Sequence, residues 1–248
     1  MDKTSLGDRM KNNYENIHRI YLTRRMPLIL RLDGVAFHTL TKKLNKPYDI
    51  GFKQCMLGTA RFLVENIMGA KLAYVQSDEI SILLTDYDSL TTEAWFGKNL
   101  QKMVSVSASM ATMKFNQLYN LHIHSSKKIK EYGLFDSRAF VIPKEEVCNS
   151  FIFRQTDAVR NSIQGLGQAY FSHKELQGKS CNVIQDMLMI EKNINWNDIS
   201  PYFKRGGCVY RDLGIDSDKD TNNVVVDLEP PIFTQDRDYI ERYLFIEK

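Results

Sequence analysis

The sequence predicts an α+β fold in which helices cover a mixed or antiparallel sheet. Two segments of strand-like composition carry this prediction: residues 28–32, and residues 72–84, whose pattern is typical of a hairpin with an acidic tip. Helical periodicity between and after them gives the order strand, helix, hairpin, helix, strand, which is typical of such a sheet with helices over one face. The 248 residues, 43% of them hydrophobic and 25% charged, are enough to bury a sizeable core.

The other elements follow from periodicity and from capping residues. Apolar residues at steps of three and four predict helices over residues 5–25 and 51–68. Asp88 or Ser89 is expected to cap a long helix that runs to about residue 120. The remaining expected elements are helices at 144–149, 151–170 and 236–248, a strand at 139–142 and a strand pair at 209–210 and 224–226.

Composition excludes several classes of protein. The four cysteines lie far apart without a Cys-x-x-Cys pair, so a zinc knuckle and a disulfide scaffold are not expected. The N-terminus is polar and no run approaches the roughly 18 apolar residues of a membrane span, so we expect a soluble, cytoplasmic protein with no membrane partner. A net charge of +3 permits a nucleic-acid partner but does not establish one.

Acidic residues lie at the ends of the predicted strands. Asp33 and Gly34 end the first strand, and Ser77, Asp78 and Glu79 form the tip of the hairpin. Two carboxylate sites separated by one helix suit a pair of divalent metal ions that handles nucleotide phosphates. Glycine allows close approach of a backbone carbonyl, which can supply a further oxygen. The alternative is that both segments are only acidic turns.

The basic residues give weaker signals. The segment 178–180 imitates the end of a P-loop, but residue 173 is histidine where that motif needs glycine. Lysines 42, 43 and 46 follow Asp33 and are candidates to hold a triphosphate, or else belong to a solvated loop. Small basic clusters such as Lys204-Arg205 could follow an RNA backbone or be ordinary surface features.

A series of motifs resembles the tRNA-histidine guanylyltransferase family. It covers roughly residues 5–210, and its members occur in a fixed order. They are Arg31-Leu32-Asp33-Gly34, Phe37-His38, Lys46-Pro47-x-Asp49, Tyr74-x-Gln76-Ser77-Asp78-Glu79-x-Ser81, Trp95-Phe96, Phe135-Asp136-Ser137-Arg138, Arg154-Gln155-x-Asp157, Leu176-Gln177-Gly178 and Lys204-Arg205-Gly206.

The resemblance implies a fold and an activity. The fold would be polymerase-palm-like (ferredoxin-like), with an antiparallel sheet, packed helices, and helical and hairpin elaborations. Residues 1–248 would form a single catalytic domain with a C-terminal elaboration from about residue 205. The activity would be Mg²⁺-dependent 3′-to-5′ RNA nucleotidyl transfer, in which ATP or GTP activates a tRNA 5′ end and an NTP is then added to it. The family is typically tetrameric, which implies a homotetramer.

The resemblance also implies roles for individual residues. Asp33 and Asp78 would be the carboxylate ligands of two Mg²⁺ ions, Gly34 would supply a carbonyl, and Glu79 and Ser77 belong to the same catalytic motif. The expected nucleotide-binding residues are Lys46, Asp49, Phe37 and His38. The expected RNA-binding residues are Arg154, Asp157, Arg160, Asn161, Lys204 and Arg205.

One departure from the family pattern leaves the exact reaction open. The guanylyltransferases proper carry His-Ile-Asn-Asn after the Arg-Gln-x-Asp motif, whereas this chain has Val159-Arg160-Asn161-Ser162. This is similar to the branch that repairs 5′-truncated tRNA by templated addition. The alternatives are a non-templated tRNA-histidine guanylyltransferase, a non-catalytic RNA-binding palm module and a palm-type nucleotide cyclase.

Overall fold

The computed structural model describes residues 4–124, 132–212 and 223–244, which form an α+β fold around one antiparallel sheet. The sheet has six described strands in the order β4-β1-β3-β2-β5-β6. Their bounds are β1 (Leu28–Val35), β2 (Ala70–Gln76), β3 (Glu79–Leu84), β4 (Leu134–Val141), β5 (Gly207–Arg211) and β6 (Val224–Asp227). The predicted antiparallel sheet with helices packed on it is therefore confirmed.

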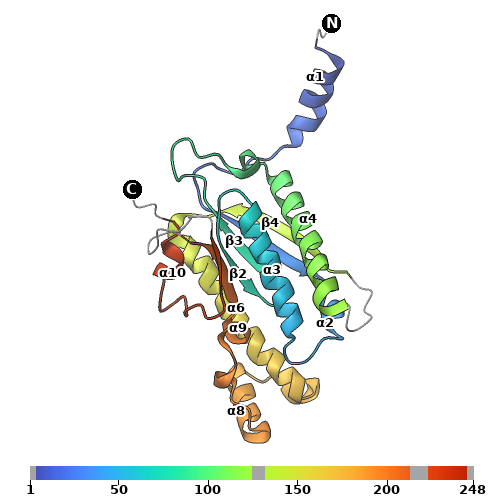
Figure 1. Ribbon diagram of the computed structural model, residues 1–248, viewed down its shortest axis with the longest axis vertical. Coiled ribbons are helices and arrows are strands. Elements are labelled where there is room, and N and C mark those ends of the chain that lie inside the picture. Colours follow the sequence, from blue (N-terminus) through green and yellow to red (C-terminus); the bar gives the residue numbers. More distant parts are fainter. Residues whose placement is uncertain (1–3, 125–131, 213–222, 245–248) are drawn as a thin grey trace.

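Helices cover both faces of the sheet (Figure 1). Alternation along β1 sends Leu28, Leu30 and Leu32 to the core beneath α3 (Ile50–Asn66) and α4 (Leu100–Tyr119). Ile29 belongs to a second core on the opposite face, which α6 (Lys144–Tyr170) and α10 (Asp238–Glu241) help to enclose. The prediction of helices over only one face was thus too narrow.

Shorter elements surround this sandwich. Near the N-terminus a helical arm projects away from the body of the protein (Figure 1). The short elements are α1 (Leu6–Met10), η1 (Lys11–Glu15), η2 (Asn16–His18), α2 (Phe37–Thr41), η3 (Trp95–Lys98), η4 (Asn120–His124), α7 (His173–Leu176), α8 (Cys181–Lys192), η5 (Trp196–Asp198) and α9 (Pro201–Arg205). None of the helices in the described part of the chain combines the length and apolar character needed to cross a membrane.

Several predicted boundaries were wrong. The N-terminal helical arm ends at residue 18 because Tyr21 pairs with Asn99 as an isolated β-bridge. The long helix starts at residue 100, since the side chain of Asn99 accepts the backbone N–H of Lys102 and caps it, whereas Asp88 pairs with Lys71.

Three further boundaries also differ. Strand β4 begins at Leu134 because its first residues pair with β1 down to Val35. The two helices expected between residues 144 and 170 are one, and its buried Val147, Cys148 and Phe151 pack on the sheet across the expected break. The C-terminal helix is limited to α10 within the described residues. The prediction of one domain with a C-terminal elaboration from about residue 205 stays a prediction.

A buried ion pair anchors the approach to β1. Asp86 is 2% exposed, and its carboxylate lies 3.0 Å from Lys98 Nζ and accepts the backbone N–H of Arg25 at 3.0 Å. The ammonium of Lys98 also donates to the carbonyls of Thr23 and Met26, both at 2.8 Å. Burial raises the pKa of Asp86, but the hydrogen bonds from Arg25 and Lys98 outweigh it and leave the pKa below its ordinary value.

We predict that Asp86→Asn lowers the free energy of unfolding at pH 7 by about 3 kcal/mol, because Lys98 loses its buried counter-charge. A carboxyl group with a lowered folded-state pKa stabilises the fold above its unfolded pKa, and this contribution is lost as the pH falls through the folded value. The difference between variant and wild type should therefore shrink below about pH 4. Urea unfolding at several pH values measures this difference in the free energy of unfolding.

Asp88→Asn is the control, since its partner contact with Lys71 lies nearer the surface, with side chains 40% and 19% exposed. We expect it to cost about 1 kcal/mol or less. Equal losses in the two variants at pH 7 would contradict an anchoring role for Asp86.

Candidate active site

Asp33 and Asp78 are brought together where β1 meets the β2–β3 turn. Asp33 is the register partner of Glu79, the first residue of β3, and Asp78 directly precedes it. The backbone N–H of Gly34 donates to the carbonyl of Asp78 at 3.1 Å, so the main chain itself ties the two segments together. The end of β1 and the β2–β3 turn, which α3 separates in the sequence, thus form one acidic edge, as the sequence predicted.

Both turns at this edge hold a non-glycine residue in the left-handed region. Ala36, just after β1, has φ 55° and ψ 32°, and Ser77 has φ 48°. Such conformations cost free energy in residues other than glycine, and they cluster at functional sites. The tight turn at Ser77 places Asp78 two residues after the end of β2 and directly before β3.

Gly34 is required by packing. A Cβ atom at this position would lie 2.5 Å from Cγ of Phe37. Phe37 is 2% exposed, and its ring contacts the rings of Phe52, Phe115 and Phe135. Phe37, which the sequence analysis expected to bind nucleotide, therefore lies in the core beneath the acidic edge.

The electrostatics of the edge favour a cation. Burial raises the pKa of Asp78, and the charges of Asp33 and Glu79 raise it further, against hydrogen bonds from the Asp78 backbone and Ser77. A divalent ion would relieve this excess of negative charge, so the residues fit the implied Mg²⁺. Within the described residues no group of three or more His, Cys, Asp or Glu side chains is arranged to hold a metal. The remaining ligands would have to be main-chain or phosphate oxygens.

The Glu79 carboxylate is occupied by two arginines. Glu79 is 3% exposed, and Arg154 donates to it from Nε at 2.7 Å and from Nη2 at 2.6 Å. Arg31 Nη2 lies 2.8 Å from the same carboxylate, and the Ser81 hydroxyl donates to it at 3.2 Å. Glu79 thus forms the centre of a buried ion network between the sheet and α6.

Arg154 is buried by the same network. It is 9% exposed, and its Nη1 also donates to Asp157 at 3.0 Å. Asp157 in turn pairs with Arg160, whose side chain is 58% exposed. Among the residues predicted to contact RNA on this helix, Arg160 and Asn161 are exposed. The buried position of Arg154 does not support a direct RNA contact.

The other predicted binding residues are divided between surface and structural positions. Lys46 and His38 are exposed. Asp49 caps α3, accepting the backbone N–H of Phe52 at 3.0 Å and that of Asn45 at 3.1 Å. The Lys204 ammonium donates to the carbonyl of Asn197 at 2.5 Å, and Arg205 Nε donates to that of Pro230 at 2.8 Å. Their roles in binding stay predictions.

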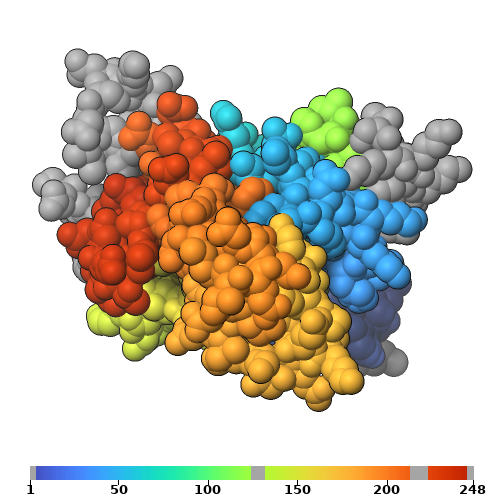
Figure 2. All heavy atoms as spheres, turned by 90° about the horizontal axis from the view of Figure 1, so that it is seen from below, coloured from blue at the N-terminus to red at the C-terminus, as the bar shows by residue number. Residues whose placement is uncertain are grey.

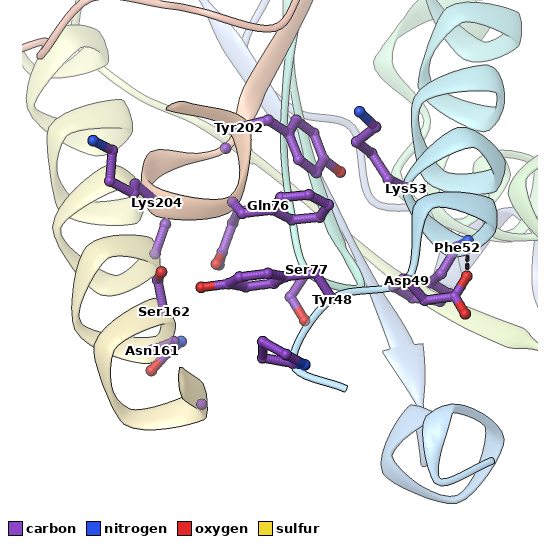
Figure 3. A pocket seen from close by; sticks show the side chains of 15 residues that line it. Tyr48, Asp49, Phe52, Lys53, Gln76, Ser77, Asn161, Ser162, Tyr202 and Lys204 are labelled. Carbon is purple, nitrogen blue, oxygen red and sulfur yellow. Dashed lines mark hydrogen bonds between the residues drawn. The ribbon is translucent and has the colours of Figure 1, made fainter. Parts of the chain in front are cut away.

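Sequence reasoning missed a cavity beside the acidic edge (Figure 3). It has a volume of about 230 Å³, and Ser77 and Gln76, next to Asp78, form part of its wall. Tyr48 and Phe203 also line it, with their rings stacked at a centroid distance of 4.3 Å. The available signal was an aromatic residue beside each predicted binding lysine, Tyr48 near Lys46 and Phe203 next to Lys204.

A third acidic residue was also missed. Asp136 on β4 is the register partner of Asp33 on the side away from Glu79. Its side chain is 48% exposed and lies 3.8 Å from Arg138. The signal was its place in the Phe135-Asp136-Ser137-Arg138 motif.

Known proteins share this sequence pattern. A family model described as tRNAHis guanylyltransferase matches residues 7–143, more than half of the chain. An uncharacterised protein of Acanthamoeba polyphaga mimivirus is 28% identical over 242 residues, covering 89% of this chain and 81% of that protein. The tRNA(His) guanylyltransferase of Debaryomyces hansenii is 29% identical over 199 residues, covering 75% of this chain and 73% of that protein.

Solved structures share the fold. A bacterial tRNA(His) guanylyltransferase-like protein in complex with ATP matches with a TM-score of 0.89 and 50% identity, covering 98% of this chain and 100% of that one. A bacterial protein of the same description in complex with GTP matches with a TM-score of 0.79 and 44% identity over 98% of this chain and 100% of that one. The chain therefore belongs to the tRNAHis guanylyltransferase family of nucleotidyltransferases.

Proposed function

We propose that the protein is a Mg²⁺-dependent 3′-to-5′ RNA nucleotidyltransferase that activates the 5′ end of a tRNA and adds nucleotides to it. The observation that carries this proposal is the union of Asp33 and Asp78 at one edge, tied by the Gly34–Asp78 backbone hydrogen bond, in a chain of this family. A non-catalytic RNA-binding module would have no need to bring two carboxylates together under mutual repulsion.

Mg²⁺ would be held by the carboxylates of Asp33 and Asp78 and by the carbonyl of Gly34. When bound, it would lower the pKa of the attacking hydroxyl and neutralise charge on the phosphates. The chain's own contribution is to hold the two carboxylates in a fixed position. The left-handed turn at Ser77 and the β1–β3 register keep both carboxylates at one place, so little reorganisation is needed when substrate arrives.

The substrates follow from the family. ATP or GTP would activate a tRNA whose 5′ end is monophosphorylated or truncated, in keeping with the ATP and GTP complexes of the bacterial relatives. The 3′-hydroxyl of an incoming NTP would then attack the activated 5′ phosphate and displace the activating group. Exposed Lys46 and His38 would contact the NTP, and exposed Arg160 and Asn161 the RNA.

Templated repair of 5′-truncated tRNA is the form of this activity that we favour. It is supported by Val159, which occupies the place of the family's histidine and lines a groove together with Ile152 and Trp196. Phosphate and metal contacts carry no information on base identity. Non-templated addition of guanine to tRNA-histidine is the second candidate, because the described relatives bear that name. The active form would be a cytoplasmic homotetramer in which residues 1–248 act as one catalytic domain.

The choice of nucleotide tests this proposal. We predict that a tRNA lacking its first nucleotide gains the complement of the facing base, whichever base that is, because a mismatch displaces the incoming 3′-hydroxyl. A displacement of about 1 Å costs roughly 100-fold in rate. The measurement is to vary the facing base through all four identities and to sequence the products. Addition of guanine whatever the facing base would contradict templated repair and would favour the non-templated guanylyltransferase reaction.

We predict that Asp33→Asn and Asp78→Asn each abolish label transfer from NTP to tRNA while the fold persists, because each removes one charged ligand oxygen at a strand end. Transfer is measured with labelled NTP over a Mg²⁺ series, and folding by circular dichroism. Asp186→Asn, at an exposed position of α8, is the control and should remain active. Near-normal turnover of either variant in saturating Mg²⁺ would contradict the assignment of Asp33 and Asp78 as metal ligands.

We predict that Glu79 acts by positioning, in place of the direct catalytic role expected from its motif. Glu79→Gln should lower the free energy of unfolding by about 3–5 kcal/mol, because Arg154 and Arg31 lose their buried partner. It should leave the Mg²⁺ concentration for half-maximal activity within about twofold of wild type. Combining it with Arg154→Met should cost less than the sum of the two single changes, since the residues are in contact. A strongly raised Mg²⁺ requirement with unchanged stability would instead make Glu79 a ligand.

A further inference from the structure

The end of β1 and the start of β4 carry three unlike pairs of residues on one face of the sheet. Each pair consists of residues that lie opposite each other in the β1–β4 register. The pairs are Val35 with Leu134, Asp33 with Asp136 and Arg31 with Arg138. All three lie on the face away from α4, because Leu32 and Phe135, which alternate with them, belong to the core beneath α3 and α4. This face is therefore apolar, then acidic, then basic along the strands.

The apolar pair is exposed. Val35 is 48% exposed and Leu134 is 56% exposed. Within the described residues, neither side chain belongs to a hydrophobic core or packs against one. Tyr132, two residues before Leu134, is 67% exposed and adds an aromatic ring at this end of β4. A single exposed apolar residue needs no explanation, whereas an apolar pair beside a candidate active site is typical of a binding surface.

The start of β4 is held in place by α4. The side chain of Asn116 accepts the backbone N–H of Gly133 at 2.9 Å and donates to its carbonyl at 2.8 Å. The Thr112 hydroxyl accepts the backbone N–H of Phe135 at 3.1 Å, and the Phe135 side chain is buried in the core. The two neighbours of Leu134 are thus fixed, so Leu134 faces solvent from a preorganised strand. Such a surface loses little conformational entropy when it binds a partner.

The apolar pair lies next to the acidic edge. Val35 follows Asp33 by two residues, which is about 7 Å along a strand. Seen from below, the segment that follows β1 (blue) lies beside α6 and the helices after it (yellow and orange) (Figure 2). A molecule that rests on Val35 and Leu134 therefore lies beside the carboxylates proposed to hold Mg²⁺.

The order of the three pairs suits the end of an RNA duplex. Under the proposed function, the reactive 5′ phosphate lies at the acidic pair, and the base of the same nucleotide lies a few ångströms away. The apolar pair offers that base an uncharged contact, whereas Arg138, whose side chain is 59% exposed, offers charge on the other side, where phosphates fit. The last base pair of a duplex exposes a flat face, and apolar side chains can contact such faces.

We infer that Val35 and Leu134 form an apolar platform that contacts the exposed face of the last base pair of the acceptor stem. This contact would position the 5′ phosphate of the stem at Asp33 and Asp78. The choice of an RNA end as the partner rests on the proposed function, since the platform adjoins the residues proposed to carry the reaction.

Binding of two matched RNA duplexes in Mg²⁺ without NTP tests the platform. One duplex is open and ends in a recessed 5′ monophosphate, and the other has the same base pairs but is closed at that end by a loop. The wild type should bind the open duplex more tightly. Val35→Ser/Leu134→Ser should bind the open duplex about fivefold more weakly than the wild type and the closed duplex equally well. Because the contact is apolar, this fivefold ratio should not change with salt, although every affinity falls as salt rises.

Val226→Ser/Leu228→Ser is the matched control. It removes the same two kinds of side chain at the opposite edge of the sheet, where they are 38% and 39% exposed. It should bind both duplexes as the wild type does. Leu134→Trp is the converse variant, because its larger ring should bind the open duplex about fivefold more tightly. The open duplex alone should quench the added indole emission. Thermal unfolding checks that each variant is folded.

The outcomes separate this inference from the proposed function. Asp33→Asn should stop label transfer yet keep the preference for the open duplex, because it leaves the apolar pair intact. If the wild type transfers no label but shows a preference that Val35→Ser/Leu134→Ser loses, the function is overturned and the platform stands.

Three results would overturn the platform. The first is a wild type that transfers label but binds the open and closed duplexes equally. The second is a folded Val35→Ser/Leu134→Ser variant with unchanged affinity for the open duplex, or with the same loss for both duplexes. The third is a change in the oligomeric state of that variant in size-exclusion chromatography, because the apolar pair would then contact a second copy of the chain.

Discussion

The structure of the acidic edge depends on the buried ion pair between Glu79 and Arg154. This pair joins the first residue of β3 to the middle of α6 with two hydrogen bonds, of 2.6 and 2.7 Å. Both charges are almost removed from water, so each needs the other, and the loss of either would leave an uncompensated charge. The pair therefore fixes where α6 crosses the sheet, and with it the start of β3, which Asp78 directly precedes.

The two acidic residues of the hairpin tip, Asp78 and Glu79, have different electrostatic surroundings. Glu79 is in the strand and faces α6, where arginines neutralise it. Asp78 lies in the turn, where no arginine reaches it among the described residues and where Asp33 adds to its charge. A carboxylate that buried arginines neutralise needs those partners in the folded state, whereas carboxylates that lie close together without a partner favour a bound cation. These adjacent carboxylates thus differ in their surroundings because one lies in the strand facing α6 and the other lies in the turn.

The placement of α6 also shapes the cavity beside the β2–β3 turn. Because Arg154 holds the helix against the sheet, the next turns carry Asn161 and Gly165 past the loop at Tyr48. The cap of α3 by Asp49 fixes that loop from the other side. A cavity therefore forms beside Asp78 between elements that are each held by their own contacts.

The sequence by itself determined the acidic edge and the antiparallel sheet. Asp33, Gly34 and Asp78 lie at strand ends that hydrophobic alternation reveals, and such local patterns survive folding. It did not determine the surroundings of Glu79 and Arg154, which are 75 positions apart and meet only when α6 packs on the sheet. It likewise placed Phe37 at a binding site, whereas aromatic packing draws that ring into the core. The cavity at Tyr48 was decided by tertiary structure alone, because its wall comes from three separate segments whose sequences carry no sign of their mutual contact.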